Sequence, residues 1–198
     1  PRSTHCISSA ASDVYKRQQY EDKLPDGYTK IHKGVAYDDN AFRLFFERFG
    51  SEEWFRRTLF VFVADHVSSE KFAAQTRSYP GNYHIIGFMY TPDGALRGEV
   101  SEVVQQLDIM PTLLGLLGNR EPYFAFGRDV LNEPQRPQWS VSWDGAFQAV
   151  TNDGTIRFDD AQETPAASSA GDSLLQDFRA LVQQYYSHAE KKSYIVHD

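Results

Sequence analysis

Apolar side chains recur at helical spacing in two segments of the chain. In residues 37–49 they stand three or four positions apart, Asp38 or Asp39 can cap the start, and Gly50 follows the end. Near the C-terminus the same spacing joins Leu174, Leu175, Phe178, Leu181, Val182 and Tyr185. The spacing predicts two amphipathic helices, the first preceded by a polar surface loop over residues 19–33.

Two shorter apolar segments have the pattern of strands. Residues 58–64 form an unbroken run of β-branched and aromatic side chains, which predicts a strand buried on both faces. Residues 85–90 predict a second strand, ended by the turn sequence of residues 91–94. A helix followed by a buried strand is typical of an α/β fold with a mostly parallel sheet flanked by helices, where ligands bind beyond the carboxyl ends of the strands.

In the second half of the chain a helical pattern of apolar residues is followed by short alternating runs. Apolar residues between 101 and 118 predict a helix that starts near Pro111 and ends at Gly118. After Asn132, three short alternating runs at residues 139–143, 147–150 and 155–158 are separated by Asp-Gly and Asn-Asp-Gly sequences. These runs predict antiparallel strands joined by hairpin turns, so we expect a small C-terminal subdomain over residues 133–198.

Residues 1–18 lack apolar periodicity. The sequence SSAASDVYKRQ at positions 8–18 resembles the conceptual translation of a transposon-type sequencing adaptor. We therefore expect residues 1–18 to be a non-native segment, and the reading frame to begin inside a gene whose upstream part is missing. The only cysteine, Cys6, lies in this segment, so the remainder offers neither disulfides nor thiolate metal ligands.

The net charge of the chain bears on which kinds of partner it can bind. The chain has a net charge of −7, and the segment 1–18 contributes more basic than acidic residues. Because an acidic chain offers little basic surface to a phosphate backbone, we expect no nucleic-acid partner.

Asp65 and His66 directly follow the predicted buried strand. A carboxylate and an imidazole on such a rigid platform are suitable ligands for a divalent cation. Two ligands alone do not hold a catalytic metal. The alternative interpretation is structural: Asp65 caps the next turn and His66 is a solvated loop residue.

The sequence around this pair resembles the sulfatases and lipoteichoic acid synthases of the alkaline phosphatase superfamily. In that family an Asp-His pair after an apolar strand binds the metal. The matching segments occur in the family's order: YDDNAFRLFF (37–46), LFVFVADH (59–66), QLDIMPTLL (106–114) and YFAFGRD (123–129). One departure lies at Ile86 and Gly87, where the family commonly has a proline and a larger residue.

The resemblance implies that residues 19–132 are the C-terminal part of a sulfatase-like catalytic domain. It implies that Asp65 and His66 bind a divalent metal, most often Mn²⁺, with Zn²⁺, Mg²⁺ and Ca²⁺ as alternatives. A glutamate ligand and a threonine nucleophile are expected upstream of this chain. The closest group consists of membrane-anchored enzymes with an extracytoplasmic, or periplasmic, catalytic domain, so membrane association is expected only through the missing N-terminal part.

The predicted function is that of a metal-dependent transferase for phosphoglycerol or phosphoethanolamine groups, acting on a phosphorylated lipid headgroup and inactive as the fragment. The alternatives are a sulfatase that hydrolyses sulfate or phosphate esters and a non-catalytic α/β binding module.

Several other polar residues are better explained by structural roles than by catalysis or metal binding. His84 is interpreted as a surface or satisfied histidine, and Asp108 as a cap beside the first turn of the helix at Pro111. Arg128 and Asp129 are interpreted as a surface pair, although Arg128 can also meet an anion. Ser68 and Ser69 can orient the metal ligands, but a plain loop is the simpler interpretation.

Overall fold

The computed structural model describes residues 24–68, 73–158 and 172–191. The chain divides into two compact units, Pro1–Gly98 and Glu99–Asp198, and each is considered by itself. This boundary is drawn from contacts within the chain. The division of the family domain after Asn132, and the separation of residues 1–18, stay predictions.

The first unit begins with a long helix, α3 (Lys30–Phe49). It starts well before Tyr37, so the prediction that residues 30–33 belong to a loop is wrong. Thr29 caps the start in an extended conformation, and its backbone N–H donates to Nδ1 of His32 at 3.3 Å. Gly50 ends the helix as predicted, and its N–H donates to Phe46 O.

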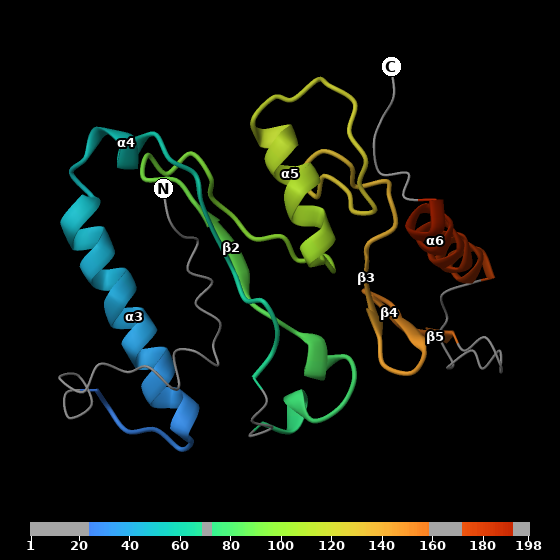
Figure 1. Ribbon diagram of the computed structural model, residues 1–198, viewed down its shortest axis with the longest axis horizontal. Coiled ribbons are helices and arrows are strands. Elements are labelled where there is room, and N and C mark those ends of the chain that lie inside the picture. Colours follow the sequence, from blue (N-terminus) through green and yellow to red (C-terminus); the bar gives the residue numbers. More distant parts are fainter. Residues whose placement is uncertain (1–23, 69–72, 159–171, 192–198) are drawn as a thin grey trace. The chain divides into compact units, whose positions relative to one another are not determined.

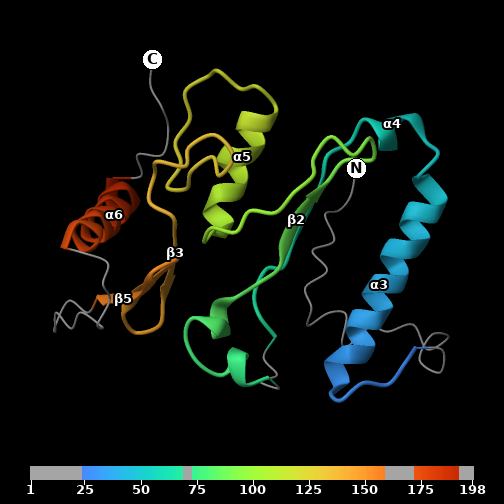
Figure 2. The same cartoon turned by 180° about the vertical axis from the view of Figure 1, so that it is seen from behind.

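Helix α3 packs its aromatic face against a strand pair and the short helix α4 (Glu53–Arg56). The ring of Phe46 lies 5.4 Å from that of Phe55, 5.9 Å from Phe60 and 5.6 Å from Tyr90, between ring centroids. Figures 1 and 2 show α3 running alongside this strand pair. Phe55 is 3% exposed and forms the centre of the cluster.

Strands β1 (Phe60–Val63) and β2 (Gly87–Tyr90) pair antiparallel, with Phe60 opposite Tyr90 and Val63 opposite Gly87. The expected parallel pairing is therefore not what the described strands show. Nor is β1 buried on both faces, because Val63 is 44% exposed. Within the described residues β1 has a single neighbouring strand, so its apolar composition exceeds the burial it receives. Between the strands lie two short turns of 3₁₀ helix, Ala74–Thr76 and Gly81–Tyr83.

The second unit opens with a 3₁₀ turn, Gln106–Asp108, which leads into α5 (Ile109–Leu116). The predicted helix is confirmed, with Pro111 in its first turn. Gly118 has a positive φ of 70°, a conformation that ends a helix and that favours glycine.

Three antiparallel strands follow in the order β3–β4–β5: β3 (Trp139–Trp143), β4 (Phe147–Thr151) and β5 (Gly154–Phe158). The predicted hairpins are confirmed, and Gly145 and Gly154 adopt the positive φ values that their turns require.

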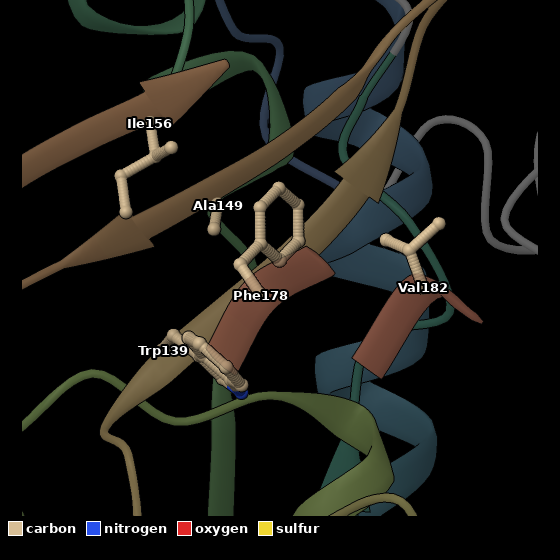
Figure 3. Packing of buried hydrophobic residues seen from close by; sticks show 5 residues of the cluster. All are labelled: Trp139, Ala149, Ile156, Phe178 and Val182. Carbon is tan, nitrogen blue, oxygen red and sulfur yellow. The ribbon is translucent and has the colours of Figure 1, made fainter. Parts of the chain in front are cut away.

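Helix α6 (Asp172–Lys191) supplies the apolar face that covers this sheet. Phe178 is fully buried against Ala149, and its ring lies 5.9 Å from that of Trp139. Figure 3 shows the buried cluster that joins helix and sheet: Trp139, Ala149, Ile156, Phe178 and Val182. Among the described residues no helix is both long and apolar enough to span a membrane.

Candidate metal centre

The Asp65-His66 pair stands where the β1–β2 ladder ends. Ala64 continues the ladder one residue beyond β1, because its N–H donates to Ile86 O at 3.0 Å. Asp65 and His66 come next, and both side chains are more than half exposed. The pair is thus anchored by strand hydrogen bonds while its side chains remain accessible to solvent and solutes.

Short contacts orient the two side chains toward each other. Asp65 Oδ1 accepts a hydrogen bond from the backbone N–H of His66 at 2.9 Å. His66 Nδ1 lies 2.7 Å from Val67 O. Because a carbonyl oxygen only accepts, Nδ1 carries the proton in this arrangement, and Nε2 keeps its lone pair in the neutral ring. Nε2 in turn lies 3.5 Å from Asp65 Oδ2.

This arrangement fits a pair of metal ligands. Two donor atoms on one tetrahedral zinc ion, each bonded at about 2.1 Å, lie about 3.4 Å apart. Metal-binding histidines usually donate their second ring N–H to a carboxylate or a backbone carbonyl, as His66 does to Val67. The donor chemistry, one carboxylate oxygen and one imidazole nitrogen, suits Zn²⁺ or Mn²⁺.

The pair is only part of a centre. Across the described ranges, no group of three or more His, Cys, Asp or Glu side chains is placed to hold a metal ion. His84 is exposed ahead of β2 and does not complete such a group. Ser68 is exposed beside the pair, whereas Ser69 lies outside the described residues. Any further ligands must therefore come from other residues.

Asp108 has the structural role that its position beside Pro111 indicates, with a different partner. It does not cap α5; its Oδ2 accepts the N–H of Gln105 at 3.0 Å and so caps the preceding 3₁₀ turn. Its Oδ1 accepts the N–H of Arg128 at 2.8 Å. Asp108 is 4% exposed, and this burial raises the pKa of its carboxyl group, although the two N–H donors and the Arg128 charge oppose the rise.

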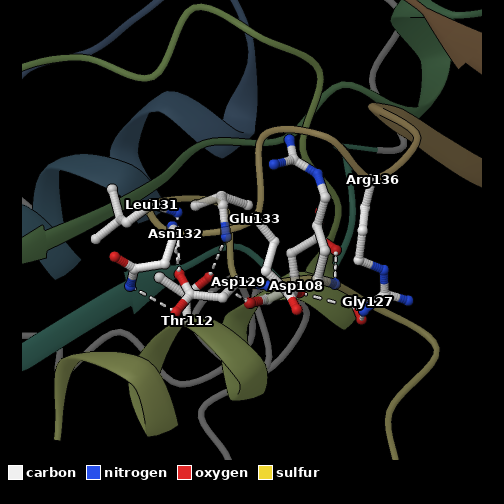
Figure 4. Close-up of polar contacts among 10 residues, drawn as sticks. Asp108, Thr112, Gly127, Asp129, Leu131, Asn132, Glu133 and Arg136 are labelled. Atoms are coloured by element: carbon white, nitrogen blue, oxygen red, sulfur yellow. Dashed lines mark hydrogen bonds and ion pairs between the residues drawn. The ribbon is translucent and has the colours of Figure 1, made fainter. Parts of the chain in front are cut away.

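Arg128 and Asp129 are not a surface pair, so that interpretation is wrong. They are 3% and 6% exposed, respectively. Asp129 Oδ1 accepts the backbone N–H groups of Leu131 and Asn132, and its Oδ2 accepts Asn132 Nδ2 at 2.8 Å (Figure 4). The sequence did not indicate this burial, because charged residues are usually exposed. In this loop they can be buried because their polar groups form hydrogen bonds within the protein.

Two glycines allow this loop to approach its neighbours. A Cβ atom at Gly127 would overlap the backbone of Leu107, and a Cβ atom at Gly115 on α5 would overlap Asp129 Oδ2. The glycine of the FGRD sequence was the available signal for such close packing.

Comparison with known proteins agrees with this fold. The sulfatase family model matches residues 2–119, which is more than half of the chain and includes Asp65 and His66. The match also includes most of residues 1–18, so the adaptor interpretation of that segment stays a prediction. A crystal structure of a protein in the alkaline phosphatase superfamily from Vibrio parahaemolyticus superposes with a TM-score of 0.70 at 20% sequence identity.

That superposition covers 91% of this chain and 48% of the Vibrio protein, so the chain spans about half of that protein's length. The α/β fold class is confirmed, with small antiparallel sheets in the described residues. Members of this superfamily are enzymes that generally use divalent metals. The chain belongs to the sulfatase family, and its fold is that of the alkaline phosphatase superfamily.

Proposed function

We propose that this chain carries two metal ligands of an extracytoplasmic transferase that moves phosphoglycerol or phosphoethanolamine groups, similar to the lipoteichoic acid synthases. The observation that carries the proposal is the 3.5 Å spacing of Asp65 Oδ2 and His66 Nε2 at the end of β1, in a chain of the sulfatase family. The ordered sequence segments from residue 37 to residue 129 support the transferase group within that family.

In the proposed enzyme Asp65 and His66 hold a divalent cation, with Mn²⁺ as the first choice and Zn²⁺, Mg²⁺ or Ca²⁺ as alternatives. A bound cation supplies Lewis acidity that polarises the phosphate ester and activates a hydroxyl nucleophile. Val67 O holds the Nδ1 proton and thereby keeps Nε2 available as a donor. The carboxylate of Asp65 orients the adjacent backbone through the His66 N–H.

The proposed enzyme needs further parts besides this pair. A glutamate ligand and a threonine nucleophile are proposed for an upstream segment, together with a membrane anchor. The substrate is a phosphorylated lipid headgroup. The threonine hydroxyl would displace the lipid alcohol at phosphorus, and the resulting phosphodiester on threonine would then pass its group to an acceptor hydroxyl and release the threonine hydroxyl.

Metal binding by the 198-residue chain tests the role of the pair directly. We expect calorimetric titration with Mn²⁺ or Zn²⁺ to show weak binding, because two protein ligands leave the rest of the coordination sphere to water. Replacing either ligand, Asp65→Ala or His66→Ala, should weaken this binding at least about tenfold. His84→Ala is the matched control, since it removes an exposed histidine of the same unit. Equal binding by all variants would refute the assignment and favour a non-catalytic module.

The reaction itself is tested on the product of the complete gene. A phosphatidylglycerol substrate should lose its headgroup in a metal-dependent reaction that Asp65→Ala abolishes. If the same protein instead cleaves an aryl sulfate and leaves the lipid intact, the sulfatase alternative replaces the transferase.

A further inference from the structure

A cavity of about 290 Å³ lies in the second unit, and neither residue of the metal pair lines it. It is bordered by the loop that carries Arg128 and Arg136, by the start of β3 at Trp139, and by helix α6 through Asp177, Ala180 and Gln184. A water molecule occupies about 30 Å³ in the liquid. The cavity therefore has room for a small organic molecule and is larger than an inorganic ion needs.

Arg128 is the unusual feature of this cavity. Its side chain is almost fully buried, at 3% residue exposure. The guanidinium Nη2 has one long contact, 3.5 Å from Val103 O. Nε is buried and has no hydrogen-bond partner, and no ion pair joins Arg128 to a carboxylate among the described residues. A buried cation that makes no ion pair is costly, which favours a bound anion at this position.

The nearby carboxylates form no ion pair with this arginine, although the Arg128 charge attracts the carboxyl group of Asp108. Both oxygens of Asp108 already accept backbone N–H groups, from Arg128 and Gln105. Asp177 lies on an exposed position of α6 and makes no ion pair with either arginine. The carboxylate that does pair with a cavity arginine is Glu133, at 3.3 Å from Arg136 Nη1, outside the cavity lining.

Arg136 brings a second guanidinium to the same cavity. Its Nη1 donates to Gly127 O at 3.0 Å, a bond that is drawn in Figure 4 and fixes the side chain over the loop. A guanidinium has five N–H donors, so this bond leaves donors for a ligand. The ring of Trp139, which is 7% exposed as a residue, provides an apolar wall.

We propose that this cavity binds a small organic anion, with its oxyanion head at Arg128 and Arg136 and its apolar part against Trp139. Guanidinium groups bind carboxylate and phosphate oxygens through paired N–H donors, and the guanidinium-bearing side chains of Arg128 and Arg136 both line the cavity. The site goes beyond the transferase reaction, because none of its lining residues is a proposed metal ligand.

Calorimetric titration of the full 198-residue chain tests the site with defined probes. Phenyl phosphate and benzoate represent the two kinds of oxyanion head on an aromatic body, inorganic phosphate represents the head alone, and sodium chloride at matched ionic strength is the control. We expect saturable binding of at least one aromatic anion, and tighter binding of it than of inorganic phosphate. The stronger of the two aromatic probes identifies the head group.

Two variants locate the binding. Arg128→Met keeps the apolar stem and removes the cation, and should weaken binding about tenfold to a hundredfold. Ala180→Leu adds a larger side chain to the cavity lining from an exposed position of α6, and it leaves Arg128 in place. This variant should abolish binding without the risk that loss of a buried arginine disturbs the fold. Arg120→Gln removes an exposed arginine outside the cavity and should bind as the unmodified chain does. Heat no larger than that of sodium chloride, or binding that survives Ala180→Leu, would overturn the proposal.

Discussion

At the scale of single residues, Asp108 ties two segments together with one side chain. Its two carboxylate oxygens accept N–H groups from Gln105 and from Arg128, which is 20 residues further along the chain. The neighbouring Thr112 is also shared: its hydroxyl donates to Asp108 O and accepts the N–H of Val130. These bonds fasten the loop after residue 126 to the start of α5.

The carboxyl group of Asp108 makes the stability of the folded protein depend on pH. Burial raises its pKa above the ordinary value of 3.8, so the folded state favours the protonated form. The resulting stability is fully present below about pH 4 and is lost as the pH rises through the folded pKa. Asp108→Asn removes the titrating carboxyl group. The decrease in the free energy of unfolding caused by this substitution should therefore be largest at pH 4 and should become smaller toward pH 7.

Urea unfolding of both proteins at a series of pH values measures this difference. Thr112→Val is the control, because it removes hydroxyl bonds from the same corner without a titratable group, and its cost should be the same at every pH. A pH-independent cost of Asp108→Asn would show that the pKa of Asp108 is not raised in the folded protein.

Single residues also show what the sequence could predict. The apolar strand before Asp65 and His66 placed the pair at the end of a strand, because strand patterns are local. The burial of Arg128 was not predictable, since it results from the approach of residues 107–108 and 127–128, which no local pattern records. The wrong interpretation of Arg128 and Asp129 as a surface pair followed from their polarity.

At the scale of elements, α5 and the loop after it fit together only because Gly115 has no side chain. Alanine is favoured over glycine inside a helix by about 1 kcal/mol. At position 115, however, the added Cβ would overlap Asp129 Oδ2. We therefore expect Gly115→Ala to destabilise the protein by about 1–3 kcal/mol in spite of its helix propensity.

A double-mutant cycle separates the two effects. In an Asp129→Ala background the overlapping oxygen is absent, so Gly115→Ala should be neutral or stabilising there. Chemical unfolding of the four proteins gives the coupling free energy. Equal effects of Gly115→Ala in both backgrounds would mean that the loop does not pack on this face of α5.

Elements were predictable to the extent that their signals are local. The hairpins of β3, β4 and β5 follow from alternation and from Asp-Gly and Asn-Asp-Gly turns, and they were placed closely. The start of α3 was missed because its first turn is mostly polar, with Lys30, His32 and Lys33, and because the cap at Thr29 works with His32 rather than with a glutamate. The antiparallel pairing of β1 with β2 was missed because an apolar run does not specify the direction of its neighbour.

At the scale of the whole molecule, the described residues offer a metal two protein donors. A catalytic zinc ion is usually held by three protein ligands with water in the fourth position. We therefore expect the 198-residue chain to show no hydrolysis of p-nitrophenyl phosphate or of an aryl sulfate above the rate of its Asp65→Ala variant, with Mn²⁺ or Zn²⁺ present. A rate above this blank would show that the chain holds a complete centre.

The family and fold were predictable because several segments match in order, and order over a long stretch is specific. The division of the chain after Gly98 was not, because it depends on contacts between segments that carry no sequence motif. The cavity beside Arg128 likewise needs the fold, since its lining comes from residues 105 to 184.

The hydrogen bond from Ala64 to Ile86 has an evolutionary consequence. It closes the ladder next to Asp65, so the backbone that carries the pair is held by the strands on one side, while Val67 O holds the ring of His66 on the other. Substitutions at described positions further along the connection, such as residues 73–78, can therefore accumulate with little effect on the two donors.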